Sequence, residues 1–155
     1  MIRRAILKDI PEINHLLKQV NYVHYEKRKD IFKLGNKYTD EELSTLIQDD
    51  NRPIFVITNQ NDTVLGYVFC IIEQHINHNL LTDIKTLYID DFCVDENYRG
   101  KSLGTQLYNY VKEYAKSIDC YNITLNVWSL NESAKQFYEH LGLIPQKVKM
   151  EEILK

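Results

Sequence analysis

The chain has 155 residues, a formal net charge of −3 and three cysteines, a size at which one domain can bury about 68–70% of its unfolded surface. The acidic balance argues against general nucleic-acid binding, which needs a basic face, and no apolar run approaches the roughly 20 residues of a membrane span. Sparse cysteines, with no apolar signal segment after Arg4, indicate reduced thiols and a cytoplasmic location.

The N-terminal half of the chain predicts a strand, two helices and a β-hairpin. Asp9 and Glu12 have the spacing of a capping box ahead of one apolar stripe, and Thr39 and Glu42 repeat it ahead of the next. Residues 21–37 are polar and aromatic without a period, which predicts an irregular segment. The expected elements are a strand at Ile2–Leu7, helices carrying Ile13–Val20 and Leu43–Ile47, and hairpin strands at Ile54–Thr58 and Val64–Glu73.

The C-terminal half alternates strands with helices. The stripe from Leu103 to Ile118 has helical spacing. Periodicity alone supports no more than an α/β or α+β fold. A last strand with an exposed edge could pair with another subunit, so a homodimer is an open expectation. The expected elements are strands at Lys85–Val94, Ile123–Trp128 and Gln146–Ile153, and helices at Leu103–Ile118 and Ser133–His140.

The turn between the strand ending at Val94 and the helix beginning at Leu103 is small and basic. The first N–H groups of a helix have no partner inside it, and the helix dipole adds roughly half a positive charge there. Arg99 and Lys101 add two full charges, and Gly100 allows a ligand to approach the backbone closely. The segment therefore predicts a site for a phosphate-bearing cofactor.

A P-loop is the first alternative for this turn. Gly100, Lys101 and Ser102 end like one, but the pattern G-x-x-x-x-G-K-S/T requires glycine at position 95, where Asp95 stands. A carboxylate there would point into the nest meant for phosphate. No G-x-G-x-x-G follows a strand either, so a nucleotide triphosphatase and a dinucleotide enzyme are both disfavoured.

Two blocks of the sequence resemble the GNAT family of acetyl-CoA-dependent N-acetyltransferases. Arg99–Gly104 reads RGKSLG and is similar to the cofactor motif Q/R-x-x-G-x-G/A, with Ser102 where the family usually has glycine. Leu125–Leu143 is similar to the family block L-x-V-x-x-x-N-x-x-A-x-x-F-Y-x-x-x-G-F/L. The resemblance implies the GNAT fold, a single α/β (α+β) domain over residues 1–155 with a mixed sheet of six to seven strands and about four helices.

The same resemblance implies acetyl-CoA as the co-substrate, with no metal. The main-chain N–H of Val94 would bind the thioester carbonyl if a bulge frees it, and Asn131 would cap the last helix or bind the pantetheine arm. Ser102 would cost roughly 1–2 kcal/mol in a left-handed conformation and nothing as a helical cap, which we favour. The expected cofactor-binding residues are Phe92, Cys93, Val94, Arg99, Gly100, Lys101, Ser102, Leu103, Gly104, Thr105 and Asn131.

An amine that attacks a thioester needs a free lone pair, a stabilised oxyanion and a proton for the leaving thiolate. Leu87–Val94 resembles the corresponding strand of polyamine N-acetyltransferases, in which the first acid of a pair is the candidate base. That resemblance assigns the base to Asp90, against the alternative of a purely structural carboxylate. Neighbouring strand residues point to opposite faces, so only one of Asp90 and Asp91 is expected to face the site.

The resemblance also places the general acid at Tyr138, whose phenol could protonate the thiolate, and leaves Phe137 in the core. By spacing alone both would be core aromatics. Tyr25 and Glu26 could contact a cationic substrate, although a solvated loop is the simpler interpretation.

The expected function is acetyl transfer from acetyl-CoA to a primary amine by direct attack. The acceptor would be a small cationic, polyamine-like amine or the amino group of a peptide. The alternative is a non-catalytic acyl-CoA sensor or protein-interaction module on the same fold.

Overall fold

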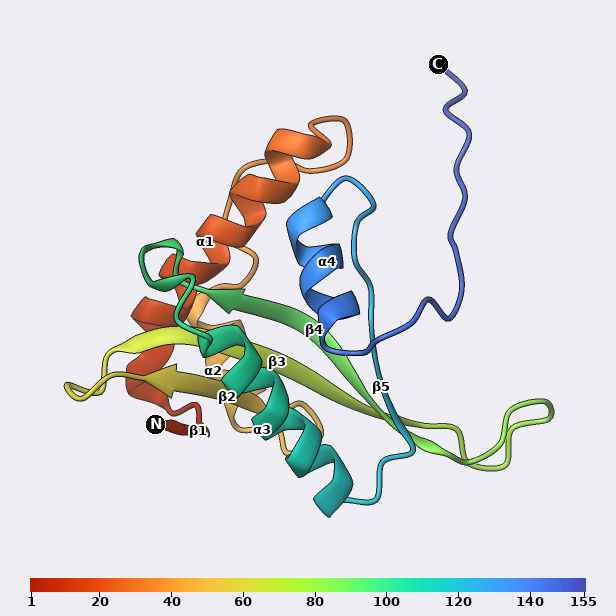
Figure 1. Cartoon of the computed structure of the whole chain (residues 1–155), viewed down its shortest axis with the longest axis horizontal. Helices are drawn as coiled ribbons and strands as arrows, with labels where there is room; N and C mark the ends of the chain where they lie inside the picture. The colour runs from red at the N-terminus through yellow and green to blue at the C-terminus, as the bar shows by residue number, and fades with distance from the viewer.

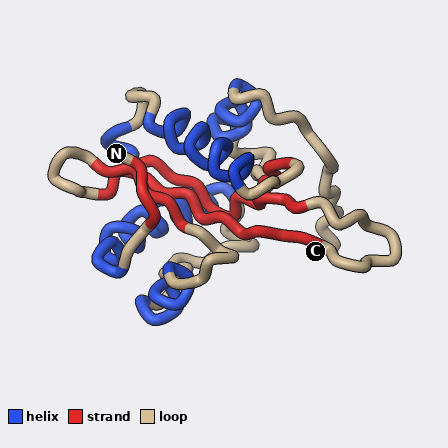
Figure 2. Tube along the Cα trace, turned by 90° about the horizontal axis from the view of Figure 1, so that it is seen from below, coloured by secondary structure: helices blue, strands red, loops and turns tan.

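The computed structural model describes all 155 residues and is built on a five-stranded sheet with the order β1-β2-β3-β4-β5. Neighbouring strands are antiparallel except for the parallel pair β4–β5. Helices lie on both sides of the sheet (Figures 1 and 2). The elements are β1 (Ile2–Arg4), α1 (Ile10–Lys27), α2 (Asp40–Ile47), β2 (Ile54–Thr58), β3 (Val64–Gln74), β4 (Lys85–Val94), α3 (Leu103–Ser117), β5 (Asn122–Leu125) and α4 (Glu132–His140), with short 3-10 turns at Leu7–Asp9 and Glu96–Tyr98.

The sheet has five strands, so the expectation of six to seven is wrong, whereas the four helices agree. The strand expected at Gln146–Ile153 does not form. Residues 144–155 are neither helix nor strand and make no main-chain hydrogen bond, and they leave the sheet as an extended tail (Figure 1). A strand needs a neighbour that supplies hydrogen bonds, and this chain places none beside the tail.

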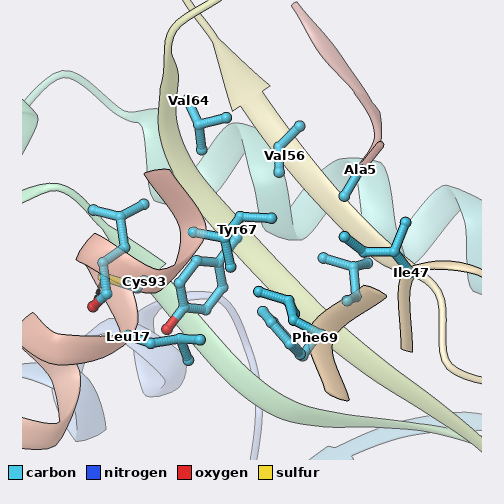
Figure 3. Close-up of a cluster of buried hydrophobic side chains, with 12 residues drawn as sticks. Ala5, Leu17, Ile47, Val56, Val64, Tyr67, Phe69 and Cys93 are labelled. Atoms are coloured by element: carbon cyan, nitrogen blue, oxygen red, sulfur yellow. Dashed lines mark hydrogen bonds between the residues drawn. The ribbon is translucent and has the colours of Figure 1, made fainter. Parts of the chain in front are cut away.

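Two hydrophobic clusters position the sheet between the helices. On one face, α1 and α2 cover Tyr67 and Phe69 of β3, and Figure 3 shows the Tyr67 ring among these buried side chains. On the other face, Leu107 and Val111 of α3 pack against Val68. Successive β3 residues therefore serve opposite layers, and each fully buried aliphatic side chain contributes about 1.5–3 kcal/mol.

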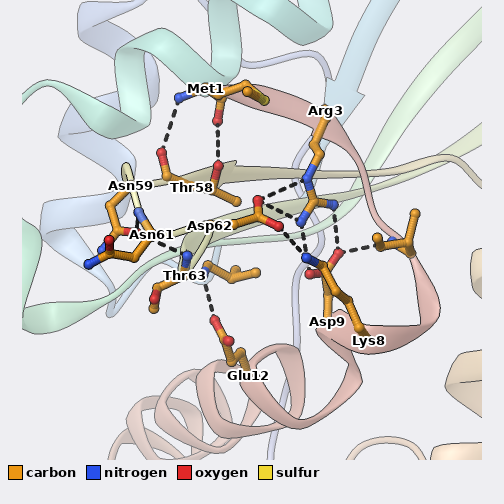
Figure 4. Close-up of polar contacts among 12 residues, drawn as sticks. Met1, Arg3, Lys8, Asp9, Glu12, Thr58, Asn59, Asn61, Asp62 and Thr63 are labelled. Carbon is orange, nitrogen blue, oxygen red and sulfur yellow. Dashed lines mark hydrogen bonds and ion pairs between the residues drawn. The ribbon is translucent and has the colours of Figure 1, made fainter.

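The capping box expected at Asp9 and Glu12 is wrong. Asp9 is buried and accepts two hydrogen bonds from the Arg3 guanidinium, at 2.8 and 3.0 Å. Glu12 instead accepts from the main-chain N–H of Val64. Figure 4 shows the Arg3 guanidinium binding both Asp9 and Asp62, whereas Glu12 lies outside this network. A 3-10 turn precedes α1. The Asp9 carboxylate therefore binds Arg3 and does not cap the helix.

The second capping box is confirmed at the start of α2. The main-chain N–H of Glu42 donates to Thr39 Oγ1 at 3.1 Å, and that of Thr39 donates to Glu42 Oε1 at 3.0 Å. The irregular segment expected at residues 21–37 is partly wrong, because α1 continues to Lys27.

The three cysteines are free thiols. Cys70 and Cys93 are buried, and burial raises the pKa of each thiol to about 12. Cys120 is half-buried, and burial raises its pKa as well. All three therefore stay protonated at neutral pH. None of the helices combines the length and the apolar character that a membrane span requires.

Candidate functional site

The turn between β4 and α3 collects unsatisfied main-chain donors. The N–H groups of residues 99–105 donate no hydrogen bond within the protein, and the first bond of the helix runs from Gln106 N to Ser102 O at 3.0 Å. Gly100 has φ +83°, a conformation that favours glycine. A continuous run of free N–H groups at a helix start has the form of an anion site.

Two cations are held at the same turn. Arg99 Nε donates to the Val94 carbonyl oxygen at 3.4 Å, and the Lys101 ammonium lies 5.3 Å from the centre of the Tyr98 ring. Gly104 lets α4 approach α3, because a Cβ there would come within 3.0 Å of Phe137 Cζ. The first turn of α3 therefore combines positive charge with an open backbone.

Ser102 occupies the N-cap position of α3, but not as the cost-free cap that we expected from the sequence. Its φ is +61°, in the left-handed region, and its side chain makes no capping hydrogen bond. A left-handed conformation costs a residue with a Cβ roughly 1–2 kcal/mol. No hydrogen bond of the Ser102 side chain offsets this strain.

We expect Ser102→Gly to stabilise the protein by about 0.5–1 kcal/mol. Glycine relieves the left-handed strain, and the greater freedom of the unfolded chain offsets part of the gain. Thermal unfolding measures the change. Ser102→Ala is the matched control and should change stability little, since it keeps the Cβ and loses no hydrogen bond. A destabilised glycine variant would contradict the assignment of strain to this residue.

A β-bulge in β4 governs the two adjacent acids. Phe69 pairs with Asp91 and Cys70 pairs with Ile89, so Asp90 is an extra residue with no partner on β3. Side-chain alternation shifts by one at this point.

The shift is visible in the packing of β4. Phe92 and Val94 pack on the α3 side of the sheet, and so do Leu87 and Ile89, although the two pairs differ in parity. An unbulged strand would place only one parity there.

Both carboxylates consequently reach Lys37. Its ammonium lies 3.0 Å from Asp91 Oδ2 and 3.7 Å from Asp90 Oδ2. The expectation that Asp90 and Asp91 face opposite sides is wrong, because the bulge turns them the same way. Burial acts to lower the pKa of Lys37, but the charge and hydrogen bond of Asp91 outweigh it, so the pKa is raised and the ammonium stays charged.

Asp90 and Asp91 differ in their exposure and in how many of their carboxylate oxygens are already hydrogen-bonded. Asp91 is 8% exposed, with Oδ1 accepting from the Tyr67 hydroxyl at 3.0 Å and Oδ2 from Lys37. Asp90 is 27% exposed, and its sole polar partner is Lys37 at the longer distance. Asp90 therefore keeps oxygens free to accept a proton or bind an amine.

An aromatic cluster that the sequence did not predict lies close to Asp91. Phe32 stacks on His24 at 5.1 Å and meets Trp128 edge-on at 5.3 Å. Burial lowers the pKa of His24, and the charge of Asp91 opposes this without reversing it, so the ring is neutral at pH 7.

The fold brings Trp128 to His24 and Phe32, which lie about a hundred residues earlier in the sequence. Tyr25 instead lies beside the Lys29 ammonium at 5.4 Å, and Glu26 is exposed. The one signal in the sequence was the presence of aromatic residues in a segment that is otherwise polar.

Tyr138 lies on α4, with its ring against Phe92 at 6.1 Å and Phe137 at 5.3 Å. Burial, reinforced by the charge of Asp91, raises the pKa of Tyr138 above its ordinary value, so the phenol keeps its proton at neutral and mildly alkaline pH. Asn131 caps α4 by accepting from Ala134 N at 3.3 Å, which confirms one of its two expected roles.

The residues near the thioester position lie where two strands diverge. β4 pairs with β5 only from Thr86 to Ile89, so its residues 90–94 have no partner on that side (Figure 1). The Cys93 side chain is buried, with Sγ 3.9 Å from the Leu16 carbonyl oxygen, which leaves only its main chain for a ligand.

The main cavity lies away from the proposed site, and no metal site is gathered there. A cavity of about 250 Å³ lies between α1 and the β2–β3 turn, and none of Asp90, Asp91 and Tyr138 lines it. No group of three or more His, Cys, Asp or Glu side chains is gathered as a metal site.

Comparison with known proteins gives a consistent set of relatives. Residues 20–143 match the model of the acetyltransferase (GNAT) family. The chain is 27% identical over 144 residues to glucosamine 6-phosphate N-acetyltransferase of Arabidopsis thaliana, which covers 81% of this chain and 88% of that protein. The matched family region includes the bulge, the turn after β4 and all of α4.

Solved structures extend the match to the whole chain. A mutant of the BH1408 protein from Bacillus halodurans is 29% identical, with a TM-score of 0.96 over 100% of this chain and 99% of that one. An aminoglycoside acetyltransferase from an uncultured soil metagenomic sample is 18% identical, with a TM-score of 0.73 over 100% and 96% of the two chains. At that identity the match shows the fold alone.

Proposed function

The chain belongs to the GNAT family of N-acetyltransferases, and we propose that it transfers the acetyl group of acetyl-CoA to the primary amino group of a small cationic amine. GNAT acetyltransferases use acetyl-CoA as co-substrate. The observation that carries the proposal is the uninterrupted run of free N–H groups from Arg99 to Thr105, flanked by two cations. Such a run suits a pyrophosphate, which accepts several hydrogen bonds and carries negative charge.

In this proposal the pyrophosphate binds at the start of α3, and the pantetheine arm follows the unpaired edge of β4. The main chain of Phe92, Cys93 and Val94 would line the arm. The side-chain amide of Asn131 supports this course, because its oxygen caps α4 while its Nδ2 donates to no protein group. The acetyl group would then lie near the divergence of β4 and β5.

The acceptor must lose a proton before it attacks. An alkyl ammonium has a pKa near 10.4, so the neutral amine costs about 5 kcal/mol at pH 7. We assign that proton to Asp90, directly or through a water, because Asp90 has free carboxylate oxygens. The amine nitrogen then bonds to the thioester carbon, and the C–S bond breaks. The Tyr138 phenol protonates the leaving thiolate, and the proton that the nitrogen loses as the amide forms returns to the Tyr138 oxygen through water.

The aromatic cluster favours a cationic acceptor over a neutral one. His24, Phe32 and Trp128 pack together, and His24 lies close enough to Asp91 for its charge to act on the ring. A cation gains about 0.5–2 kcal/mol over an aromatic face. An amino sugar phosphate is the second candidate acceptor, supported by the similarity to the Arabidopsis enzyme. A peptide amino group is the third.

A calorimetric titration with acetyl-CoA tests the cofactor site. We expect saturable one-site binding, weakened at least tenfold, about 1.4 kcal/mol, by the joint change Arg99→Ala and Lys101→Ala, because charge-assisted contacts to the pyrophosphate are lost. Lys112→Ala removes an exposed charge further along α3 and should leave the affinity unchanged. No binding at millimolar acetyl-CoA would contradict the site.

A rate assay for thiol release then separates the acceptors. A linear polyamine, glucosamine 6-phosphate and a peptide with a free amino terminus are compared at equal concentration. The proposal expects the polyamine to react fastest. Faster reaction with the sugar phosphate would make the amino sugar phosphate the acceptor. Binding of acetyl-CoA without turnover of any amine would favour the non-catalytic sensor.

A further inference from the structure

Lys37 is the one cation that forms ion pairs with both acids of β4. Its ammonium lies 3.0 Å from Asp91 Oδ2 and 3.7 Å from Asp90 Oδ2. The other oxygen of Asp91 accepts from the Tyr67 hydroxyl at 3.0 Å, so Asp91 is fully paired, whereas Asp90 keeps oxygens free. The acetyl transfer assigned to Asp90 and Tyr138 gives Lys37 no part, although its charge lies beside the proposed base.

The position of Lys37 is fixed by its neighbours in the segment before α2. The Tyr38 ring stacks on Phe69 of β3, with ring centres 5.9 Å apart and ring planes at 8°. Thr39 caps α2 directly afterwards. The Lys37 ammonium also lies 5.5 Å from the centre of the Tyr38 ring. These contacts hold the ammonium as a fixed charge beside Asp90, unlike the charge of a free surface lysine.

An acceptor amine bound to Asp90 comes close to this charge. A nitrogen that hydrogen-bonds to Asp90 Oδ2 lies within about 6.5 Å of the Lys37 nitrogen, because Oδ2 itself is 3.7 Å from that nitrogen. Two like charges at this distance repel each other, and the repulsion disfavours the protonated form of the amine. A carboxylate acts in the opposite sense, since it favours the ammonium. Lys37 therefore offsets the tendency of the two acids to keep the acceptor charged.

Five further titratable or charged side chains face Lys37 or the two acids: His24, Tyr38, Arg52, Tyr67 and Tyr138. Burial is the main cause that lowers the pKa of His24 and raises the pKa of each of the three phenols, so none of these four groups is charged at pH 7. Arg52 is exposed, and solvent screens its charge. The fixed charges nearest a bound amine are then those of Lys37 and the two acids.

We propose that the fixed charge of Lys37 favours the neutral, nucleophilic form of the acceptor amine at Asp90, an inference that rests on the proposed acetyltransferase function. The proton leaves the amine nitrogen for Asp90 and passes from there to bulk water. Asp90 is 27% exposed, and the adjacent ammonium favours the ionised carboxylate. The nitrogen keeps the lone pair that attacks the thioester. Without Lys37, the two acids would bind the acceptor more tightly in its unreactive ammonium form.

The pH dependence of kcat tests this inference in Lys37→Gln, which removes the charge and keeps a hydrogen-bond donor for Asp91. With the linear polyamine as acceptor, the midpoint of the rise of kcat with pH should move up by about one pH unit or more. At pH 7, kcat should fall about tenfold or more, while KM for the amine falls, because the ammonium form is no longer repelled. Lys37→Arg keeps the charge and should restore the wild-type midpoint. Lys33→Gln makes the same change at an exposed lysine of the same segment and should leave the midpoint unchanged.

A second acceptor separates this role from a structural one. Trifluoroethylamine is already neutral at pH 7, so its kcat should be the same in the wild type and in Lys37→Gln. An equal fall of kcat for both amines, or an unmoved midpoint with the polyamine, would overturn the inference and leave the acetyltransferase function standing. A wild type that acetylates no amine at any pH would overturn that function, and this inference with it.

Thermal unfolding and circular dichroism check that Lys37→Gln is folded, because Asp91 is 8% exposed and loses its cation. If this variant unfolds, the double variant Lys37→Gln with Asp91→Asn takes its place, since it leaves no unpaired charge at the buried position. Its reference is Asp91→Asn alone, and the same upward move of the kcat midpoint is expected between the two. Equal midpoints in that pair would also overturn the inference.

Discussion

Asp90→Asn is expected to lower the turnover of amine acetylation by about a hundredfold or more at pH 7, because general-base assistance contributes 10²–10⁴-fold. The affinity for acetyl-CoA should not change, since the carboxylate lies away from the turn at Arg99–Thr105. Steady-state rates and a calorimetric titration of the same preparation measure both quantities. Asparagine keeps the shape of the side chain, so the loss reports the proton acceptor rather than the packing.

Asp91→Asn is the matched control for that result. Asp91 binds Lys37 and the Tyr67 hydroxyl, so this change should cost about 1–3 kcal/mol of stability, which thermal unfolding would detect. Asp90→Asn should unfold at nearly the wild-type temperature. Full turnover by Asp90→Asn between about pH 6 and pH 9 would remove Asp90 from the mechanism.

Tyr138→Phe should lower turnover at least tenfold with little effect on acetyl-CoA affinity, because it removes the proton donor and keeps the ring that packs on Phe92. The raised pKa of Tyr138 sets the pH dependence. A phenol with a raised pKa stays protonated to higher pH, so the wild-type rate should not fall between pH 7 and about pH 10 through loss of this proton. Rates across that range measure it.

Tyr121→Phe controls for the loss of a hydroxyl, since Tyr121 is 74% exposed and lies outside the proposed site. It should keep the wild-type rate. An unaltered rate in Tyr138→Phe would leave that residue as a core aromatic, and an alkaline fall centred near pH 9 would show that another group controls proton donation.

Local rules predicted the elements that depend on neighbours in sequence. The strands at Ile54–Thr58 and Lys85–Val94 have the bounds expected from their patterns, and the Thr39–Glu42 box forms as expected. Each of these is decided within a few residues, by side-chain alternation or by a hydroxyl three residues from its donor. The turn after Val94 belongs to the same group.

What the sequence did not predict depends on partners far along the chain. The bulge at Asp90 arises from the register of β4 against β3, which no window within one strand contains. Arg3 binds Asp9 across a turn, and no strand lies beside the tail at residues 146–153 to hydrogen-bond with it. The contacts of His24 and Phe32 with Trp128 likewise exist only once α1 and the segment after β5 are placed.

The three cysteines offer a practical route to spectroscopy. Two thiols are sealed inside the sheet layers and will react slowly with alkylating dyes, whereas Cys120 is partly exposed, two residues before β5 begins. Treatment of the unmodified protein should therefore attach a fluorophore at one position. That position adjoins the outer strand of the sheet, so a probe there would report on the neighbour of that strand without any engineered residue.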